Sequence, residues 1–244
     1  MASSPDPDRV RCRWARAAGS AYLLIIACGL FAELGVRGSI LAPDDPAATV
    51  ANLARHEQLY RVGLASELVM LVADVFVAGA LVAVFDVVSP RAVRVAAYFR
   101  LVHAAIVGAN LLHAYLPLLL VGAGASPGGL PAAARQHWVA TSLQLHGYGY
   151  AVGLVFFGVH CAVLGGLLLR ARAAPRLLAV LLVLAAGGYW IDSFARTLQV
   201  RYVDHAQLLG TLVLLPALVA ELSFSLWLLV RGGRDPRGSA RTRE

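Results

Sequence analysis

Residues 65–85 read ASELVMLVADVFVAGALVAVF, an apolar stretch that contains two acids, Glu67 and Asp74. It is long enough to cross the ~30 Å hydrocarbon core of a bilayer as a single helix. The two acids are seven residues apart, which is about two helical turns, so both carboxyl groups occupy one face of that helix. The stretch therefore predicts a membrane-spanning helix with one polar face.

The composition of the whole chain indicates a multi-pass membrane protein. Of its 244 residues, 59% are hydrophobic and 14% are charged, and the mean hydropathy is +0.70, which is far more apolar than ordinary soluble domains. The net charge of +7 comes from arginine, because the sequence contains no lysine. These arginines cluster at the ends of apolar segments, a pattern typical of membrane topology rather than of nucleic-acid binding.

Six apolar segments predict an all-α bundle of six membrane-spanning helices. We place the spans at residues 17–40, 62–85, 94–120, 143–169, 176–198 and 206–230. Together they form one membrane domain, residues 17–230, between Arg-rich segments at residues 1–16 and 231–244.

The arginine distribution predicts the orientation of these spans. Fourteen arginines lie in the two terminal segments and in the loops after the second and fourth spans, whereas five lie on the alternate side. The positive-inside bias then puts both termini in the cytoplasm, in agreement with an even number of spans. We expect a location in the inner membrane of a bacterium.

Polar side chains recur on single faces of the other spans, which predicts polar seams that face the interior of the bundle. The residues of these seams are Arg100, His103, Asn110 and His113 in the third span, His146, Tyr150, Phe157 and His160 in the fourth, Tyr189, Asp192 and Arg196 in the fifth, and Glu221 and Ser225 in the sixth.

Buried arginines require partners, and the seams offer several. We expect Arg100 and Glu221 to form a structural ion pair that fixes helix register. Arg196 can pair with Asp192, one helical turn away, or with Glu67. Simple polar contacts between helices remain the alternative to a chemical role for the acids of residues 65–85.

The residue inventory favours metal-free proton chemistry. The sequence lacks the HExxH and CxxC motifs and any Asp-rich repeat, so we expect no metal and no cofactor. Burial favours the neutral form of a carboxyl group, and a neutral acid beside an apolar cavity can protonate an alkene or epoxide. The predicted catalytic residues are Glu67, Asp74, Asp192, His113 and His146, and the predicted substrate-binding residues are Tyr150, Phe157, Tyr189, Trp190, Asn110 and Arg196.

Several stretches are typical of one membrane family. They are AAGSAYLLIIACGLFAE at 17–33, LYRVGLASELVMLVADVFVAGALVAVF at 59–85, YFRLVHAAI at 98–106, LHGYGYAVGLVFFGVHCAVLGGLLLRARAAPRLLAV at 145–180 and AELSFSLWLLVRG at 220–232. With them the chain resembles, over nearly its full length, the bacterial membrane family catalogued as domain of unknown function 4386. This resemblance implies six spans. It does not indicate any particular activity, because the family is named for the lack of a known one. In size and in its acids and aromatics the chain also resembles, by analogy only, small integral-membrane terpene cyclases.

We therefore expect an enzyme that cyclises or isomerises a lipophilic prenylated substrate inside the membrane. Its partners would be that lipophile and membrane lipids, with no nucleic acid, and a homodimer stays open. A proton-coupled transporter is one alternative, because acids and histidines within a bilayer also form proton relays. A membrane sensor or scaffold, whose polar seams only hold helices together, is the other.

Overall fold

A computed structural model describes residues 6–42, 44–121, 129–198 and 206–232. Within these ranges the chain is all-α, without a strand. The predicted tail at 231–244 lies almost entirely outside the described residues.

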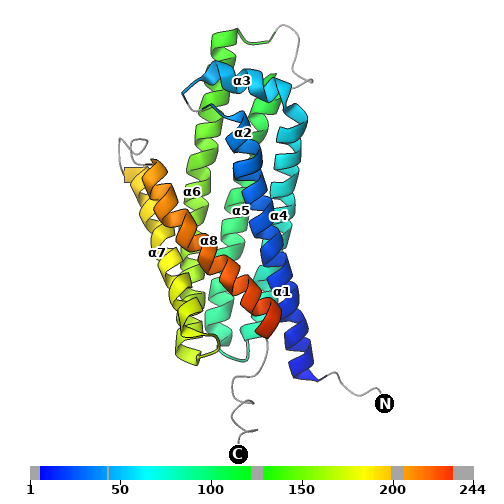
Figure 1. Cartoon of the computed structure of the whole chain (residues 1–244), viewed down its shortest axis with the longest axis vertical. Helices are drawn as coiled ribbons and strands as arrows, with labels where there is room; N and C mark the ends of the chain where they lie inside the picture. Colours follow the sequence, from blue (N-terminus) through cyan, green and yellow to red (C-terminus); the bar gives the residue numbers. More distant parts are fainter. Residues whose placement is uncertain (1–5, 43, 122–128, 199–205, 233–244) are drawn as a thin grey trace, which may run out of the picture.

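Long helices account for most of the chain (Figure 1). Helix α1 (Pro7–Leu30) continues through a π-helical segment, η1 (Phe31–Arg37), into the short helix α2 (Gly38–Ile40). The remaining helices are α3 (Pro46–Arg55), α4 (Glu57–Phe85), α5 (Pro90–Val121), α6 (Ala132–Ala171), α7 (Arg176–Leu198) and α8 (Ala206–Arg231).

Five helical segments are long and apolar enough to cross a membrane, which agrees with the first five predicted spans. They are Pro7–Ile40, Glu57–Phe85, Pro90–Val121, Ala132–Ala171 and Arg176–Leu198. Helix α8 covers the predicted sixth span but is not among these five when the described residues are searched, so the count of six is not confirmed. Their outward faces carry apolar side chains such as Val72, Leu112 and Leu119, each at least 70% exposed, as expected of a surface that contacts lipid.

Two helices begin where an aspartate is followed by proline. The Asp6 carboxylate accepts a hydrogen bond from the Asp8 amide, and the Asp45 carboxylate accepts one from the Ala48 amide. Such an acceptor satisfies a free N–H group of the first turn, and the fixed φ of proline suits the first helical position. As a result α1 starts ten residues before the predicted first span (Pro7 rather than residue 17), and the loop after that span contains α3.

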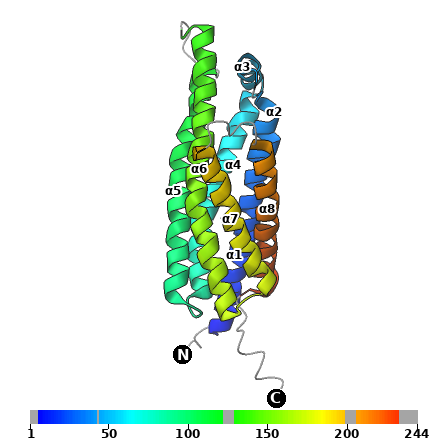
Figure 2. The ribbon, with the colours of Figure 1, turned by 90° about the vertical axis from the view of Figure 1, so that its left-hand side faces the viewer.

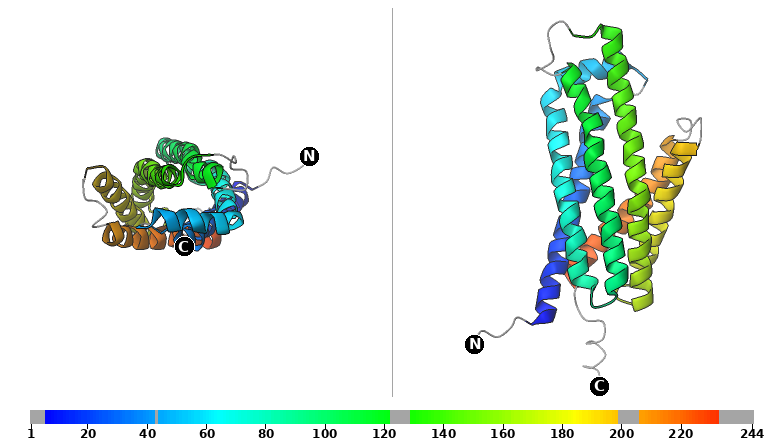
Figure 3. Two further views of the ribbon diagram at one scale, coloured as in Figure 1. Left: turned by 90° about the horizontal axis from the view of Figure 1, so that it is seen from above. Right: turned by 180° about the vertical axis from the view of Figure 1, so that it is seen from behind.

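The six long helices form a ring in chain order. Helix α1 packs against α4, α4 against α5, and so on through α6 and α7 to α8, which packs against α1 (Figure 3). Helix α1 begins and α8 ends at the same end of the ring, here called the terminal end, and α3 crosses the opposite, distal end (Figure 1). Helices α5 and α6 extend further toward the distal end than α7 and α8 do (Figure 2).

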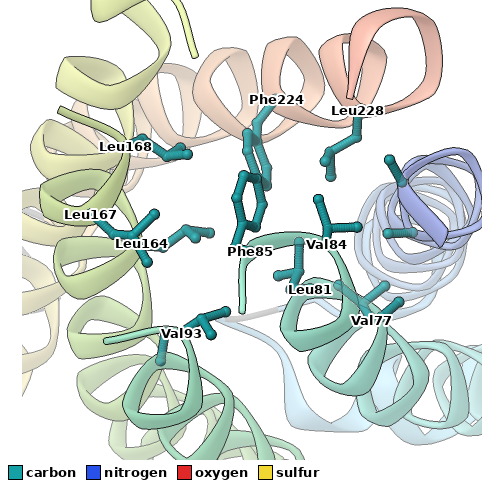
Figure 4. Close-up of a cluster of buried hydrophobic side chains, with 14 of the residues drawn as sticks. Val77, Leu81, Val84, Phe85, Val93, Leu164, Leu167, Leu168, Phe224 and Leu228 are labelled. Carbon is teal, nitrogen blue, oxygen red and sulfur yellow. The ribbon is translucent and has the colours of Figure 1, made fainter. Parts of the chain in front are cut away.

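An apolar cluster, the terminal core, fills the interior at the terminal end (Figure 4). Its larger members are Val77, Leu81, Val84, Phe85, Val93, Leu164, Leu167, Leu168, Phe224 and Leu228. Because lipid tails are as apolar as these side chains, the cluster stabilises the ring mainly through close packing.

Glycine permits the closest approach between the first and last helices of the ring. A Cβ atom at Gly19 of α1 would lie 2.7 Å from the Ser225 carbonyl oxygen and 2.8 Å from the Leu229 nitrogen of α8. No larger residue fits this crossing without separating the two helices, which is the usual role of small residues between membrane helices.

Candidate functional site

Arg100 is the centre of a buried polar network next to the terminal core. This residue of α5 is fully buried, and its Nη2 atom donates to Asp74 Oδ1 on α4 at 2.5 Å. Its Nη1 atom donates to the Tyr22 hydroxyl of α1 at 2.8 Å and lies 3.1 Å from His160 Nε2 of α6. The guanidinium also lies 4.4 Å from the centre of the Tyr22 ring and 5.2 Å from that of Phe157. One arginine thus joins four helices.

The hydrogen bonds of His160 determine which of its ring nitrogens carries the proton. Nδ1 lies 2.9 Å from the Ala96 carbonyl oxygen, which can only accept. Nδ1 is therefore the donor, and Nε2 is the acceptor for Arg100. The imidazole is fully buried with both nitrogens bonded, so it serves as a neutral link between α5 and α6.

The predicted ion pair between Arg100 and Glu221 is wrong, because Asp74 occupies that position. The order of helices explains the difference: α4 and α5 are neighbours in the ring, whereas α8 packs against α7 and α1. Asp74 was predicted as a catalytic acid, yet its Oδ1 atom is held by a buried cation.

A second arginine binds the other acid of residues 65–85. Arg37 of η1 donates to both carboxylate oxygens of Glu67, at 3.0 and 3.1 Å, and its Nε atom donates to Glu33 at 2.7 Å. Parallel hydrogen bonds of this kind are among the stronger and more directional ones in proteins. The proposed pairing of Glu67 with Arg196 is therefore wrong, and the predicted catalytic role of Glu67 meets the same objection as that of Asp74.

The predicted pair of Asn110 and His146 connects α5 to α6. The Asn110 amide donates to the His146 carbonyl oxygen at 2.8 Å and lies 3.2 Å from His146 Nδ1. A Cβ atom at Gly149 would lie only 2.0 Å from Asn110 Oδ1, so the glycine provides the space for this amide. These contacts make both residues links between helices. His113 is half-buried, and its carbonyl oxygen accepts a hydrogen bond from Ser142.

Trp190 packs between α6 and α7. Its Nε1 atom donates to the Val155 carbonyl oxygen at 3.1 Å, and it lies 2.6 Å from the position that a Cβ atom would take at Gly158. On the same helix Asp192 is buried, and Arg196 reaches toward Gly147 of α6. These contacts give Trp190 a role in helix packing, and its predicted role in substrate binding stays a prediction.

The surroundings of Glu221 of α8 differ from those of Glu67 and Asp74, which each pair with an arginine. Its Oε1 atom accepts a hydrogen bond from the Tyr189 hydroxyl of α7. Its Oε2 atom makes no hydrogen bond, and no cation pairs with Glu221, in the described part of the chain. The carboxyl group is half-buried and within electrostatic range of Arg100 and Asp74. Glu221 shares one face of α8 with the buried residues Ala217, Phe224 and Leu228, so it faces the interior.

Aromatic rings surround this carboxyl group. Tyr189 packs edge-on against Phe157, with ring centres 5.5 Å apart, and Phe157 lies 4.9 Å from the His103 ring. Tyr150 lies on α6 about two turns before Phe157. It is half-buried and within electrostatic range of Glu221 and Glu67. The aromatics Tyr150, Phe157 and Tyr189 therefore lie around Glu221, and their predicted role in substrate binding stays a prediction.

Comparison with known proteins identifies the chain at the level of a family. The family described as "Domain of unknown function (DUF4386)" matches residues 17–232. The chain belongs to the DUF4386 family. The resemblance found in the sequence is thereby confirmed, whereas the analogy with terpene cyclases is not. No curated protein and no solved structure matches the chain.

The polar interior of this DUF4386 protein becomes less accessible toward the terminal end. The Glu33 side chain is 61% exposed, Arg37 14% and Glu67 2%, and the Arg100 network further along is fully buried. Beyond Arg100 the interior is filled by the terminal core. Within residues 6–42, 44–121, 129–198 and 206–232, no group of three or more histidine, cysteine or acidic side chains could hold a metal ion.

The sequence analysis of this DUF4386 chain missed two partners in the first helix. Tyr22 and Arg37 complete the two arginine networks, but one lies in an apolar run and the other at the end of a span. The acids of the two networks, Asp74 and Glu67, lie on one face of α4. That spacing was the signal that could have predicted their pairing with arginines of neighbouring helices.

Proposed function

We propose that this protein is an integral-membrane enzyme that isomerises or cyclises a lipophilic alkene, such as a prenylated compound, by metal-free proton transfer. In this proposal Glu221 is the acid, in place of Glu67 and Asp74. The observation that carries it is the contrast among the three carboxyl groups. Glu67 and Asp74 each pair with an arginine, and the second oxygen of Asp74 is itself unbonded. What distinguishes Glu221 is that its partner within the described residues is the Tyr189 hydroxyl rather than a cation.

The hydrogen bond from Tyr189 would direct the proton. Because Oε1 of Glu221 already accepts from that hydroxyl, the proton of the neutral acid belongs on Oε2, which has no hydrogen-bond partner among the described residues. Its transfer to one alkene carbon forms a C–H bond and a carbocation at the other carbon. Loss of a proton from a neighbouring carbon to the Glu221 carboxylate then forms a new double bond and restores the acid. The sum is an isomerisation, and no oxidant, reductant or second substrate is consumed.

The rings beside Glu221 fit such an intermediate. A cation over an aromatic face gains about 0.5–2 kcal/mol, and Tyr189, Phe157 and Tyr150 border the same region. Asp192, buried on the helix of Tyr189, stays a candidate second proton acceptor, and His113 stays a more remote one. The arginine networks would hold the walls of the site in register.

The membrane arrangement is part of the proposal. We take α8, 26 residues long, as the sixth span, and the terminal end as cytoplasmic, because it carries the larger share of arginines. The polar interior would then lie toward the outer half of a bacterial inner membrane. A lipophilic substrate would enter from the bilayer, and a homodimer is compatible with this arrangement.

The ion pairs favour a second candidate function, that of a membrane sensor or scaffold. Buried pairs of arginine and carboxylate often fix helix register without taking part in chemistry, and four helices meet at Arg100. A proton-coupled transporter has less support, because the terminal core leaves an apolar plug between the Arg100 network and the terminal end.

Solvent deuterium distinguishes these functions. The protein in liposomes is incubated in D₂O with a polyprenol, a prenylated quinone and a linear triterpene hydrocarbon, and products are analysed by mass spectrometry. We expect an isomer that carries solvent deuterium, with the rate reduced at least ~100-fold by Glu221→Gln and less by Tyr189→Phe. The matched control, Asp86→Asn, changes a carboxyl group whose side chain is 41% exposed and which lies outside both arginine networks, and it should leave the rate unchanged. Equal rates for wild type and Glu221→Gln would refute the assignment. No turnover by any form, with only thermal stability altered, would favour the scaffold.

A further inference from the structure

A groove of about 500 Å³ lies between the start of α5 and the last turns of α6, at the terminal end. Its lining comes from the turn before α5, from the first turn of α5 and from one stripe of α6: Val88, Ser89, Ala92, Ala162, Val163, Gly166, Leu167, Arg170 and Ala171. Small residues leave the space open, and a Cβ atom at Gly166 would meet nothing within 4 Å. The groove is of the size of small-molecule sites.

Arg170 is the charged residue of this lining. It is exposed in the last turn of α6, where the groove reaches the end of the helix. The rest of the lining is apolar apart from the Ser89 side chain. The groove thus has an apolar wall that runs along α6 toward the middle of the helix. Its rim, at the terminal end, carries positive charge.

Among the described residues, most of the positive charge around this rim has no acidic partner. The segments 86–94 and 170–176 contain five arginines and a single acid, Asp86. Asp86 binds Arg94 at 3.0 Å, and the other four arginines (Arg91, Arg170, Arg172 and Arg176) have no ion pair in the described part of the chain. The N-terminus of α5, which begins at Pro90 beside the groove, adds the positive end of a helix dipole.

We propose that this groove binds an anionic phospholipid. One acyl chain would lie along the α6 stripe from Ala162 to Leu167, and the headgroup phosphate would lie beside Arg170. The apolar wall excludes a free inorganic anion as the natural occupant, and the uncompensated arginines favour an anionic over a zwitterionic headgroup. This inference uses a different part of the molecule from the proposed enzyme site and does not depend on it.

Native mass spectrometry of the full-length protein in detergent tests the proposal. Phosphatidylglycerol and phosphatidylcholine with identical acyl chains are titrated separately, and the dissociation constant of the first bound lipid is measured. We expect tighter binding of phosphatidylglycerol, and Arg170→Gln should weaken it about fivefold and weaken phosphatidylcholine less, because the choline group already neutralises the phosphate. Gly166→Leu, which fills the groove with a side chain, should weaken the binding of both lipids.

Arg231→Gln is the matched control, since Arg231 is an exposed arginine of the last turn of α8 at the same end of the ring. It should leave both dissociation constants unchanged. Equal weakening by Arg170→Gln and Arg231→Gln would show a general surface attraction and overturn the site. Equal wild-type affinity for the two lipids, or unchanged binding in Gly166→Leu, would overturn it as well. All four proteins should melt at similar temperatures, because none of the changed side chains is buried.

Discussion

Replacing Asp74 by asparagine removes the charge that compensates Arg100 and preserves the shape of the side chain. The asparagine oxygen can still accept a hydrogen bond from the guanidinium, which also keeps Tyr22, His160 and its two aromatic faces. The loss is therefore mainly electrostatic. Two unit charges about 4 Å apart attract by about 4 kcal/mol at an effective dielectric constant of 20, and breaking buried pairs usually costs about 3–5 kcal/mol. With the remaining partners retained, we expect a loss of about 3 kcal/mol in the free energy of unfolding.

Reversible unfolding in mixed micelles measures this loss. Repeating the substitution in an Arg100→Met protein shows whether the loss comes from the ion pair. Asp74→Asn should cost about 3 kcal/mol in the wild type and much less in Arg100→Met, because the cation is then absent. Asp86→Asn is the matched control: its pair with Arg94 has side chains 41% and 55% exposed, and exposed pairs contribute about 0–1 kcal/mol. An equal cost of Asp74→Asn with and without Arg100 would refute the ion pair as its cause.

Three further substitutions test the helix contacts by thermal unfolding in detergent. Gly19→Val should destabilise the protein by at least about 1 kcal/mol, because the valine side chain would meet the backbone of α8. The control Gly79→Ala, with nothing within 4 Å of its Cβ position, should be neutral or stabilising. The reverse order of stabilities would contradict the close crossing of α1 and α8. Gly149→Ala should be destabilising alone and much less so together with Asn110→Ala, since a Cβ atom there would lie 2.0 Å from the asparagine oxygen, and equal costs in both backgrounds would contradict this contact. Arg37→Lys should lower stability by about 1–3 kcal/mol, because a single ammonium group cannot reproduce the two parallel hydrogen bonds to its carboxylate partner, and a neutral result would show that charge alone is sufficient.

The sequence predicted the helical framework well because hydrophobic length is a local property. Apolar runs separated by arginine-rich or Gly/Pro-rich segments mark most ends of the long helices within about five residues, apart from the earlier starts of α1 at Pro7 and of α6 at Ala132. The inward faces were also predictable, since periodic polar residues in an apolar helix rarely face lipid. Glu67, Asp74, Arg100 and His146 are all buried accordingly.

The pairing of interior charges could not be predicted from depth alone. The expected pair of Arg100 and Glu221 assumed that opposite charges at a similar depth meet, but contact also requires neighbouring helices. In a ring of six, each helix packs against two others, and α5 lies between α4 and α6. Arg100 accordingly finds Asp74 on one side and His160 on the other, and no local pattern encodes that order.

The order of helices also determines which acid stays available for chemistry. With α1 and α5 on either side of α4, both of its acids meet an arginine, Arg37 or Arg100. Helix α8 lies between α7 and α1, and Glu221 contacts a tyrosine of α7 instead of a cation. A chain with the same six segments in another spatial order would pair its charges differently and leave another carboxyl group free. Within the described residues, the absence of an arginine partner at Glu221 follows from ring topology rather than from the depth of the residue in the membrane. For that reason Glu221 rather than Glu67 or Asp74 is the residue on which activity measurements should begin.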